Sequence, residues 1–321
     1  MELSFWILIF VVSFIVLLRG SSLLIRGAEK IGLAFGLPPF VIGVLIVGVG
    51  TSLPELASAV AAVAKGVTEV VTANAIGSNI TNILLVGGIL AVVGKRIEIT
   101  KSLRSSELPL FVVSTALFLG VVFDGEVSFI EAILLVAAFV IYLLYSLAGK
   151  GGVSTVGKEL GEEAKKETKK GKAIPSPKAV GIFTLGLAGV FLGAKFLVDS
   201  LLEIASIFEI SPALISLTAL ALGTSFPELF VSLRALFDKR PELAIGNIFG
   251  SNAFNILLAV GVPAMVTPLF LDSMTLFIGV PILAVASFIF LISGIAGRLN
   301  RWEGFMFLVL YVFFVLKLLG F

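Results

Sequence analysis

Long apolar runs separated by shorter polar stretches dominate this 321-residue chain. A helix needs about 20 apolar residues to cross the hydrocarbon core of a bilayer, and ten runs approach that length. The alternation with a period of two that is typical of membrane strands is absent. The pattern predicts an all-α integral membrane protein with ten transmembrane helices, near residues 4–33, 38–64, 69–93, 106–123, 127–148, 179–206, 211–237, 242–268, 272–294 and 303–320.

One long polar stretch, residues 149–178, divides these helices into two groups of five. It contains eight lysines and four glutamates. We interpret it as a solvated connecting loop, which is the usual role of such a charge run, rather than as a nucleic-acid site. The chain is therefore predicted to consist of a first half (1–148), a loop (149–178) and a second half (179–321).

Charge placement predicts the orientation of the helices. Most of the 23 Lys and Arg residues lie in alternate loops, the long loop included. The opposite loops are acidic, with Lys65 as the basic exception; their acidic residues are Asp124, Glu126, Glu209 and Asp272. Since basic loops stay on the cytoplasmic side, we expect a multi-pass protein of the plasma membrane with both termini outside.

Composition excludes several kinds of chemistry. The sequence contains neither cysteine nor histidine, which rules out disulfides, thiolate or imidazole metal sites, and Ser-His-Asp or Cys-His catalysis. With 58% hydrophobic and only 14% charged residues, the chain is not a soluble domain. A net charge of +2 gives no argument for a nucleic-acid partner.

The two halves repeat each other at a constant offset of 173 residues. The motif Gly-Thr-Ser-Leu-Pro-Glu-Leu at 50–56 recurs as Gly-Thr-Ser-Phe-Pro-Glu-Leu at 223–229. A second motif, Asn-Ala-Ile-Gly-Ser-Asn-Ile-Thr-Asn at 74–82, recurs as Asn-Ile-Phe-Gly-Ser-Asn-Ala-Phe-Asn at 247–255. Two separated motifs at one offset indicate an internal duplication.

An odd number of helices per half requires the second half to enter the membrane in the opposite orientation. The flanking charges agree, because Arg26 and Lys30 correspond to Asp199 and Glu203 at the offset. Inverted repeats with a binding site near the bilayer midplane are typical of secondary transporters. The repeat is only structural by itself, so a function has to come from the motif residues.

Each half places one glutamate, Glu55 or Glu228, near the middle of a predicted helix. A carboxylate at the bilayer centre costs several kcal/mol unless it is paired or hydrated, so such residues usually have a function. Their duplication at equivalent positions strengthens that interpretation. Any single small hydroxyl residue nearby is more often a packing residue of a membrane helix, and the motif asparagines at 74, 79, 247 and 252 fit interhelical hydrogen bonding.

Proline precedes each glutamate and removes a backbone donor. Pro54 and Pro227 are predicted to break each helix just before the glutamate and to free carbonyls at about Gly48 and Ala221. Side-chain oxygens come from both motifs: Thr51, Ser52, Thr224 and Ser225 lie beside the breaks, and the i,i+4 pairs Ser78/Asn82 and Ser251/Asn255 each share one helix face. Oxygen-only ligands with two carboxylates suit a hard divalent cation such as Ca²⁺, which takes 6–8 oxygens.

These motifs closely resemble those of the calcium/cation antiporter superfamily, the sodium/calcium and proton/calcium exchangers, in its prokaryotic ten-helix form. The resemblance extends over nearly the whole chain. It implies a Ca²⁺/cation antiporter, not an enzyme, that needs no cofactor and works by alternating access. It also implies a diamond-shaped site between the second, third, seventh and eighth helices, with the first and sixth helices sliding across this core.

The resemblance also implies roles for single residues. Glu55 and Glu228 would bind Ca²⁺, and Thr51 and Thr224 would complete its shell with the carbonyls of Gly48 and Ala221. Asn82 and Asn255 stand where the family has Asn or Asp near the site. Four serines match positions that coordinate monovalent ions in sodium-coupled relatives: Ser52, Ser78, Ser225 and Ser251.

The counter-ion follows less directly from the sequence. Sodium-coupled members commonly have an additional Asp where this chain has Asn255, and two carboxylates suffice for one Ca²⁺ or two protons. The amino-acid sequence of the two motifs, however, resembles that of sodium-coupled members more closely than that of proton-coupled ones. On charge count we favour H⁺ slightly over Na⁺. A cation channel and an intramembrane hydrolase are the alternatives; the two-fold arrangement within one chain argues against the channel, and the lack of a nucleophile–base pair argues against the enzyme.

Overall fold

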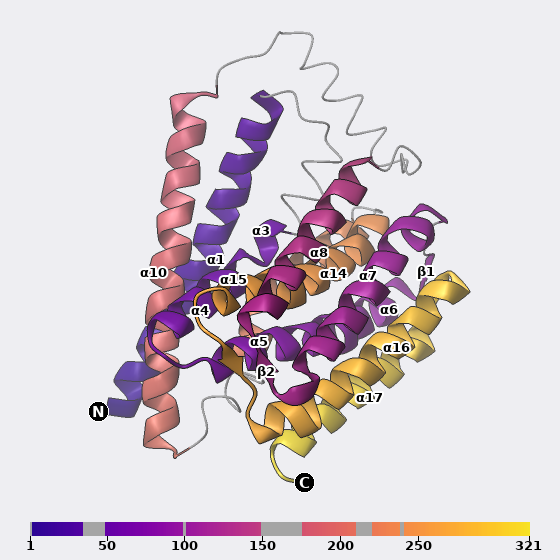
Figure 1. The fold of residues 1–321 in the computed structure, drawn as a ribbon. Coiled ribbons are helices and arrows are strands. Elements are labelled where there is room, and N and C mark those ends of the chain that lie inside the picture. The colour runs from indigo at the N-terminus through magenta and orange to yellow at the C-terminus, as the bar shows by residue number, and fades with distance from the viewer. Residues whose placement is uncertain (1, 35–48, 99–100, 149–174, 210–219, 238–240) are drawn as a thin grey trace.

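The computed structural model describes residues 2–34, 49–98, 101–148, 175–209, 220–237 and 241–321. The expectations for Gly48 and for most of the long loop therefore fall outside the described residues. Nearly all of the described chain is helical, as the apolar runs predict. The helix and strand labels below are those of Figure 1.

In the first half the helices follow the predicted spans closely. The second span is interrupted, with a short helix before a longer one. The elements are α1 (Glu2–Ala34), α3 (Val49–Thr51), α4 (Leu53–Ala64), α5 (Glu69–Ile80), the π-helical η2 (Thr81–Val86), α6 (Gly87–Gly94), β1 (Arg96–Glu98), α7 (Lys101–Val121), the 3₁₀ turn η3 (Val122–Asp124), β2 (Glu126–Val127) and α8 (Phe129–Ala148).

The second half repeats this order. Its elements are α10 (Pro177–Ile207), α12 (Ala221–Thr224), α13 (Phe226–Phe237), α14 (Pro241–Phe254), the π-helical η5 (Asn255–Ala259), α15 (Val260–Ala264), β3 (Leu269–Phe270), the π-helical η6 (Thr275–Gly279), α16 (Val280–Ala296), β4 (Arg298–Asn300) and α17 (Arg301–Leu318). Both bounds of α13 equal those of α4 plus the offset, so the sequence repeat is a structural repeat.

Two short antiparallel ribbons, which the apolar pattern does not predict, connect the halves. Strand β1 pairs with β4, with Ile97 opposite Leu299. Strand β2 pairs with β3, with Val127 opposite Leu269. These four side chains are buried. Each ribbon takes one strand from each half, and strands of two or three residues are too short to show a period in the sequence.

The predicted span 242–268 ends earlier than expected. Helix α15 stops at Ala264, and the chain then turns toward β3. Residue 267 precedes Pro268, and a residue before proline avoids the helical region. The apolar run therefore extends past the end of its helix.

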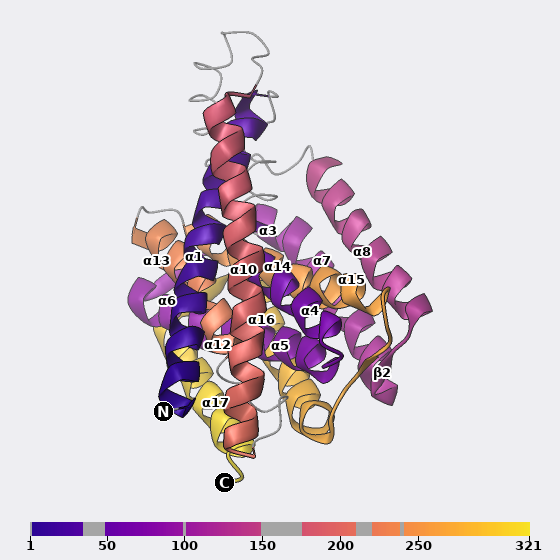
Figure 2. The ribbon, with the colours of Figure 1, turned by 90° about the vertical axis from the view of Figure 1, so that its left-hand side faces the viewer.

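Helices α1 and α10 lie side by side along one flank of the molecule, and the other helices form a bundle beside them (Figures 1 and 2). Glycines permit this close approach. A Cβ atom at Gly193 would lie 2.7 Å from the backbone nitrogen of Leu17, and one at Gly189 would lie 3.0 Å from Cα of Gly20. Small residues spaced i,i+4, as here, are typical of tightly packed membrane helices.

Lys65, the basic exception among the acidic loops, has a partner. It lies at the C-terminal end of α4 and forms an ion pair with Asp199 of α10. The pair connects the bundle to the α1–α10 flank. Partial exposure limits the contribution of such a pair to about 1 kcal/mol or less.

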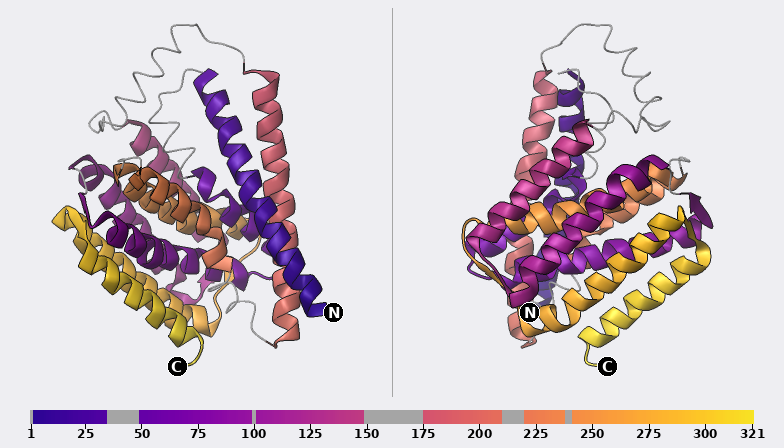
Figure 3. Two further views of the ribbon diagram at one scale, coloured as in Figure 1. Left: turned by 180° about the vertical axis from the view of Figure 1, so that it is seen from behind. Right: turned by 45° about the vertical axis from the view of Figure 1, so that its right-hand side comes forward.

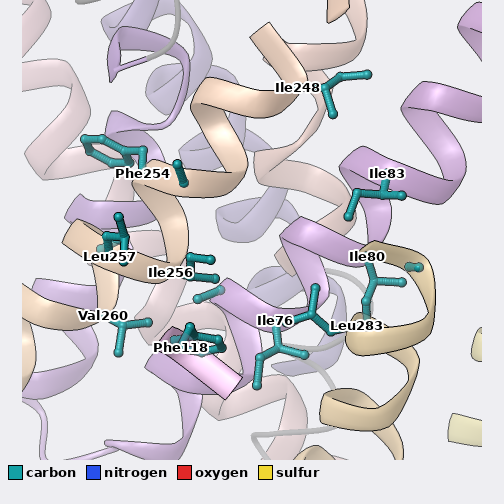
Figure 4. Packing of buried hydrophobic residues seen from close by; sticks show 14 of the residues in the cluster. Ile76, Ile80, Ile83, Phe118, Ile248, Phe254, Ile256, Leu257, Val260 and Leu283 are labelled. Atoms are coloured by element: carbon teal, nitrogen blue, oxygen red, sulfur yellow. The ribbon is translucent and has the colours of Figure 1, made fainter. Parts of the chain in front are cut away.

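Apolar side chains fill the bundle, and others cover its outside. Isoleucines of α5 and η2 pack near residues of α14, η5 and α16 in the interior (Figure 4). Large apolar residues are also exposed on the outer helices, among them Val11, Leu134, Ile141, Phe288 and Val309. An apolar exterior around a core that also buries polar groups is what a bilayer environment requires.

Four stretches within the described residues are long and apolar enough to cross a membrane: Leu3–Gly20, Glu69–Gly94, Ala244–Ala264 and Thr275–Ala296. Shorter apolar helices accompany them, for example Leu53–Ala64. Both described chain ends lie at the same end of the bundle (Figures 1 and 3). An even number of crossings has this consequence.

Candidate cation-binding site

Both predicted helix breaks are present, and each is centred on a serine. Ser52 separates α3 from α4, and Ser225 separates α12 from α13. The chain does not turn back at either break, because Ser52 keeps φ −94° and ψ 5° and Ser225 keeps φ −81° and ψ −2°. Proline follows two residues later, in the first turn of α4 and of α13, where its missing N–H costs nothing. The glutamate then stands in the same first turn.

The expectation of a freed carbonyl at Ala221 is wrong. This carbonyl accepts the backbone N–H of Ser225 at 3.1 Å and the hydroxyl of Thr224 at 3.4 Å. A proline deprives the carbonyl four residues before it, which for Pro227 is that of Gly223. The corresponding expectation for Gly48 lies outside the described residues.

The two glutamates are buried in the interior of the bundle. Glu55 is 1% exposed and Glu228 is fully buried. Ser52, three residues before Glu55, hydrogen-bonds Glu228, so the two glutamate-bearing turns meet in the interior. Each lies at a helix N-terminus, where the helix dipole favours negative charge. Two like charges buried together require a cation or protons to neutralise them.

Hydroxyl groups reach across from the opposite half. The Ser52 hydroxyl of the first half donates to Oε1 of Glu228 at 3.1 Å, and the hydroxyl of Ser251 donates to the same oxygen at 3.3 Å. Thr51 Oγ1 lies 3.4 Å from Ser251 Oγ, and Ser78 Oγ lies 3.2 Å from Thr224 Oγ1. The structure thus brings Thr51, Ser52 and Ser251 together around Glu228. Ser78 and Thr224 form a second contact between the halves.

Asn82 and Asn255 lie where an α-helix changes to a π-helix. Each stands at the start of a π-helical segment, η2 or η5, one turn beyond Ser78 or Ser251. A single turn of π-helix often marks a functional position, since it turns side chains that a regular α-helix would place elsewhere. The same irregularity in both halves supports a common role for the two amides.

Several buried oxygens have no hydrogen-bond partner within the described part of the chain. Six of them belong to the predicted site residues: both carboxylate oxygens of Glu55, Oε2 of Glu228, the hydroxyl of Ser225 and the amide oxygens of Asn82 and Asn255. Buried polar atoms are rarely left unpaired, and unpaired oxygens on the two repeated motifs are therefore candidate ligands. Six oxygens, three of them from carboxylates, match the donor number and type that Ca²⁺ prefers.

No third acidic residue joins the pair in the described ranges. In these ranges no three His, Cys, Asp or Glu side chains lie close enough together to hold one ion. The charge available at the site is therefore that of two carboxylates, as the sequence indicates.

The sequence pattern indicates only interhelical hydrogen bonding for Asn247 and gives no role to Ser232. In the structure Asn247 contacts both Thr51 and Glu228, and Ser232 contacts Asn247. The available signal was the position of Ser232, one helical turn after Glu228 and hence on the same face.

These features together define a class of protein. Two repeated half-chains each supply a broken helix, a buried carboxylate and a π-helical segment to one oxygen-lined cluster in the membrane interior. Discontinuous helices that meet between inverted repeats are characteristic of secondary transporters.

Comparison with known proteins identifies the family. A sequence profile described as sodium/calcium exchanger protein matches residues 5–148 and 178–320, so the chain belongs to that family. Sodium/calcium exchanger MaX1 of Methanosarcina acetivorans is 31% identical over 97% of each chain. Inner membrane protein YrbG of Escherichia coli is 31% identical over 80% of this chain and 79% of its own.

Solved structures agree with the family. A structure of the sodium-calcium exchanger NCX_Mj superimposes with a TM-score of 0.66 at 28% identity and covers 98% of each chain. The chain is accordingly a multi-pass membrane transporter of the cation/Ca²⁺ exchanger type, with ten helices in two inverted repeats of five.

Proposed function

We propose that the chain moves Ca²⁺ across the plasma membrane in exchange for a monovalent cation, by alternating access to one central site. The observation that carries this proposal is the pair of buried glutamates from opposite halves with three unpartnered carboxylate oxygens between them. Ca²⁺ would be bound by Glu55 and Glu228. Thr51, Thr224, Asn82 and Asn255 would contribute further oxygens, and Ser52, Ser78, Ser225 and Ser251 would serve the monovalent ion.

Mutually exclusive occupancy explains obligatory exchange. Either Ca²⁺ lies between the ionised carboxylates, or monovalent ions neutralise them. A doubly charged site without a cation is costly to enclose in a low dielectric, so the empty carrier does not switch sides. Calcium leak is thereby prevented.

For the counter-ion we propose Na⁺ as the first candidate. The serine positions that suit a monovalent ion are present, and relatives over the full length of the chain are named sodium/calcium exchangers. This choice differs from the sequence analysis, in which the number of carboxylates slightly favours H⁺. The proton remains the second candidate, because Asn255 leaves the site with two carboxylates, which two protons neutralise.

Uptake of radioactive Ca²⁺ into proteoliposomes tests the function and the counter-ion together. We expect saturable uptake with an outward Na⁺ gradient and little with an outward H⁺ gradient alone. Uptake only with the H⁺ gradient would reverse the choice of counter-ion. Uptake that needs neither gradient would contradict exchange and favour a channel.

We also propose that the two halves, 1–148 and 179–321, are joined by a cytoplasmic loop at 149–178 with both termini outside. Since the chain has no cysteine, single cysteines report orientation cleanly. An impermeant maleimide added to intact cells should label Phe321→Cys and spare Lys170→Cys, with both labelled after permeabilisation. The reverse pattern would contradict the orientation.

A further inference from the structure

The side chain of Asn247 connects the motifs of the two halves. It lies on α14 and is 3% exposed. Its Nδ2 donates to the backbone carbonyl of Glu228 at 3.4 Å and to the Ser232 hydroxyl at 3.1 Å. Its Oδ1 accepts the Thr51 hydroxyl at 3.4 Å. Both amide hydrogens are used, so this amide is held in one orientation.

Ser232 completes the connection from the other side. It is fully buried on α13, one turn beyond Glu228. While its oxygen accepts from Asn247, its hydroxyl donates to the carbonyl of Ala244 on α14, at 3.3 Å. Hydrogen bonds therefore connect α13 to α14 one helical turn after Glu228.

The first half lacks the equivalent connection. At the 173-residue offset Asn247 corresponds to Asn74, and Ser232 corresponds to Ala59, which has no hydroxyl. In the described part of the chain Oδ1 of Asn74 has no hydrogen-bond partner. The two carboxylates differ as well. Oε1 of Glu228 accepts hydrogen bonds from two hydroxyl groups, whereas neither oxygen of Glu55 has a hydrogen-bond partner in the described part of the chain.

We propose that Asn247 and Ser232 are positioning residues that hold Glu228 as the fixed side of the cation site, while Glu55 is the side that adjusts to the ion. The inference rests on the proposed function. It adds that the two glutamates, which occupy equivalent positions in the repeat, differ in how firmly their carboxylates are held. A ligand already held in place loses less freedom when the cation binds, so the fixed side provides affinity. The adjustable side allows ions of different size and charge to share one site.

The Ser232→Ala variant tests the proposal. Removing the hydroxyl leaves an amide hydrogen of Asn247 without its acceptor and frees the amide to turn. We expect the Ca²⁺ concentration for half-maximal uptake into proteoliposomes to rise about three- to tenfold, the size expected for one buried hydrogen bond. The maximal uptake rate should change little, and the melting temperature measured without Ca²⁺ should fall, because Asn247 and the Ala244 carbonyl each lose a buried hydrogen bond.

Ser58→Ala is the matched control. Ser58 is also a buried serine, 1% exposed, on the equivalent helix α4, but its hydroxyl has no partner in the described part of the chain. We expect a wild-type half-maximal concentration. If Ser232→Ala does not fold, Ser232→Cys provides the same loss, because a thiol fills a similar space but hydrogen-bonds weakly.

Two results would overturn the positioning role. The first is an unchanged half-maximal Ca²⁺ concentration in the Ser232 variant, whether or not its melting temperature and maximal rate fall, and the second is an equal rise in Ser58→Ala. The wild type separates the two proposals. Lack of uptake by the wild-type protein under either gradient would contradict the proposed function itself, whereas wild-type uptake with an unaffected Ser232 variant contradicts only the positioning role.

Discussion

Replacement of Glu228 or Glu55 by glutamine should abolish Ca²⁺ exchange. Removing one charge from a buried ion pair, here the carboxylate that would bind Ca²⁺, costs roughly 3–5 kcal/mol. This corresponds to a loss of Ca²⁺ affinity of about 100-fold or more. Glutamine keeps the shape and one carbonyl oxygen but removes the charge that neutralises half of a divalent ion. The measurement is initial Ca²⁺ uptake into proteoliposomes. Full activity in either variant would refute the assignment of these glutamates.

A folding defect is distinguishable from a binding defect in these variants. Two buried like charges destabilise the protein without a cation, so glutamine at either position should leave the melting temperature in Ca²⁺-free buffer unchanged or raised. Addition of Ca²⁺ should raise the melting temperature of the wild type only. Glu203→Gln, which alters an exposed carboxylate of α10, is the control and should behave like the wild type.

Adding a single methyl group at Gly193 should separate α1 from α10. A Cβ atom there would lie 2.7 Å from the backbone nitrogen and 2.8 Å from Cα of Leu17, and backbone atoms cannot move aside as a side-chain end can. We expect Gly193→Ala to lower the free energy of unfolding by about 1–3 kcal/mol, the usual cost of overpacking. Thermal unfolding of purified protein in detergent measures the change.

Gly181→Ala is the matched control on the same helix. Beyond its own helix backbone, no atom of the described residues lies within 4 Å of the position that its Cβ would take. Alanine also favours the helix over glycine by up to about 1 kcal/mol, so this variant should be as stable as the wild type or slightly more stable. Equal melting temperatures for the two variants would show that the glycine contact does not hold the flank in place.

Much of the architecture could be predicted from local features of the sequence. Apolar runs locate the helices, since the length needed to cross a bilayer is a property of each segment alone. Pro54 and Pro227 predict the two breaks, because a missing N–H acts within one turn of the chain. The constant offset then predicts that the second half repeats the first, and α13 begins and ends where that offset places it.

Features that depend on contacts between distant segments could not be predicted in this way. The carbonyl of Ala221 is a different case: it keeps its ordinary helical bond to the N–H of Ser225, because Pro227 deprives Gly223 instead. The π-helical turns at Asn82 and Asn255 leave no pattern in a single sequence. The different surroundings of Glu55 and Glu228 contradict what an equal repeat would suggest.

The sequence by itself determined the class of protein: ten apolar spans, a duplication, and two intramembrane glutamates behind prolines. Each of these depends on a residue and its near neighbours, where hydrophobicity and backbone chemistry act directly. Only the tertiary structure decided which oxygens meet, which glutamate is held by Asn247 and Ser232, and where glycine lets α1 approach α10. Those outcomes depend on distances of a few ångströms between helices far apart in the chain, and the packing of the whole bundle sets such distances.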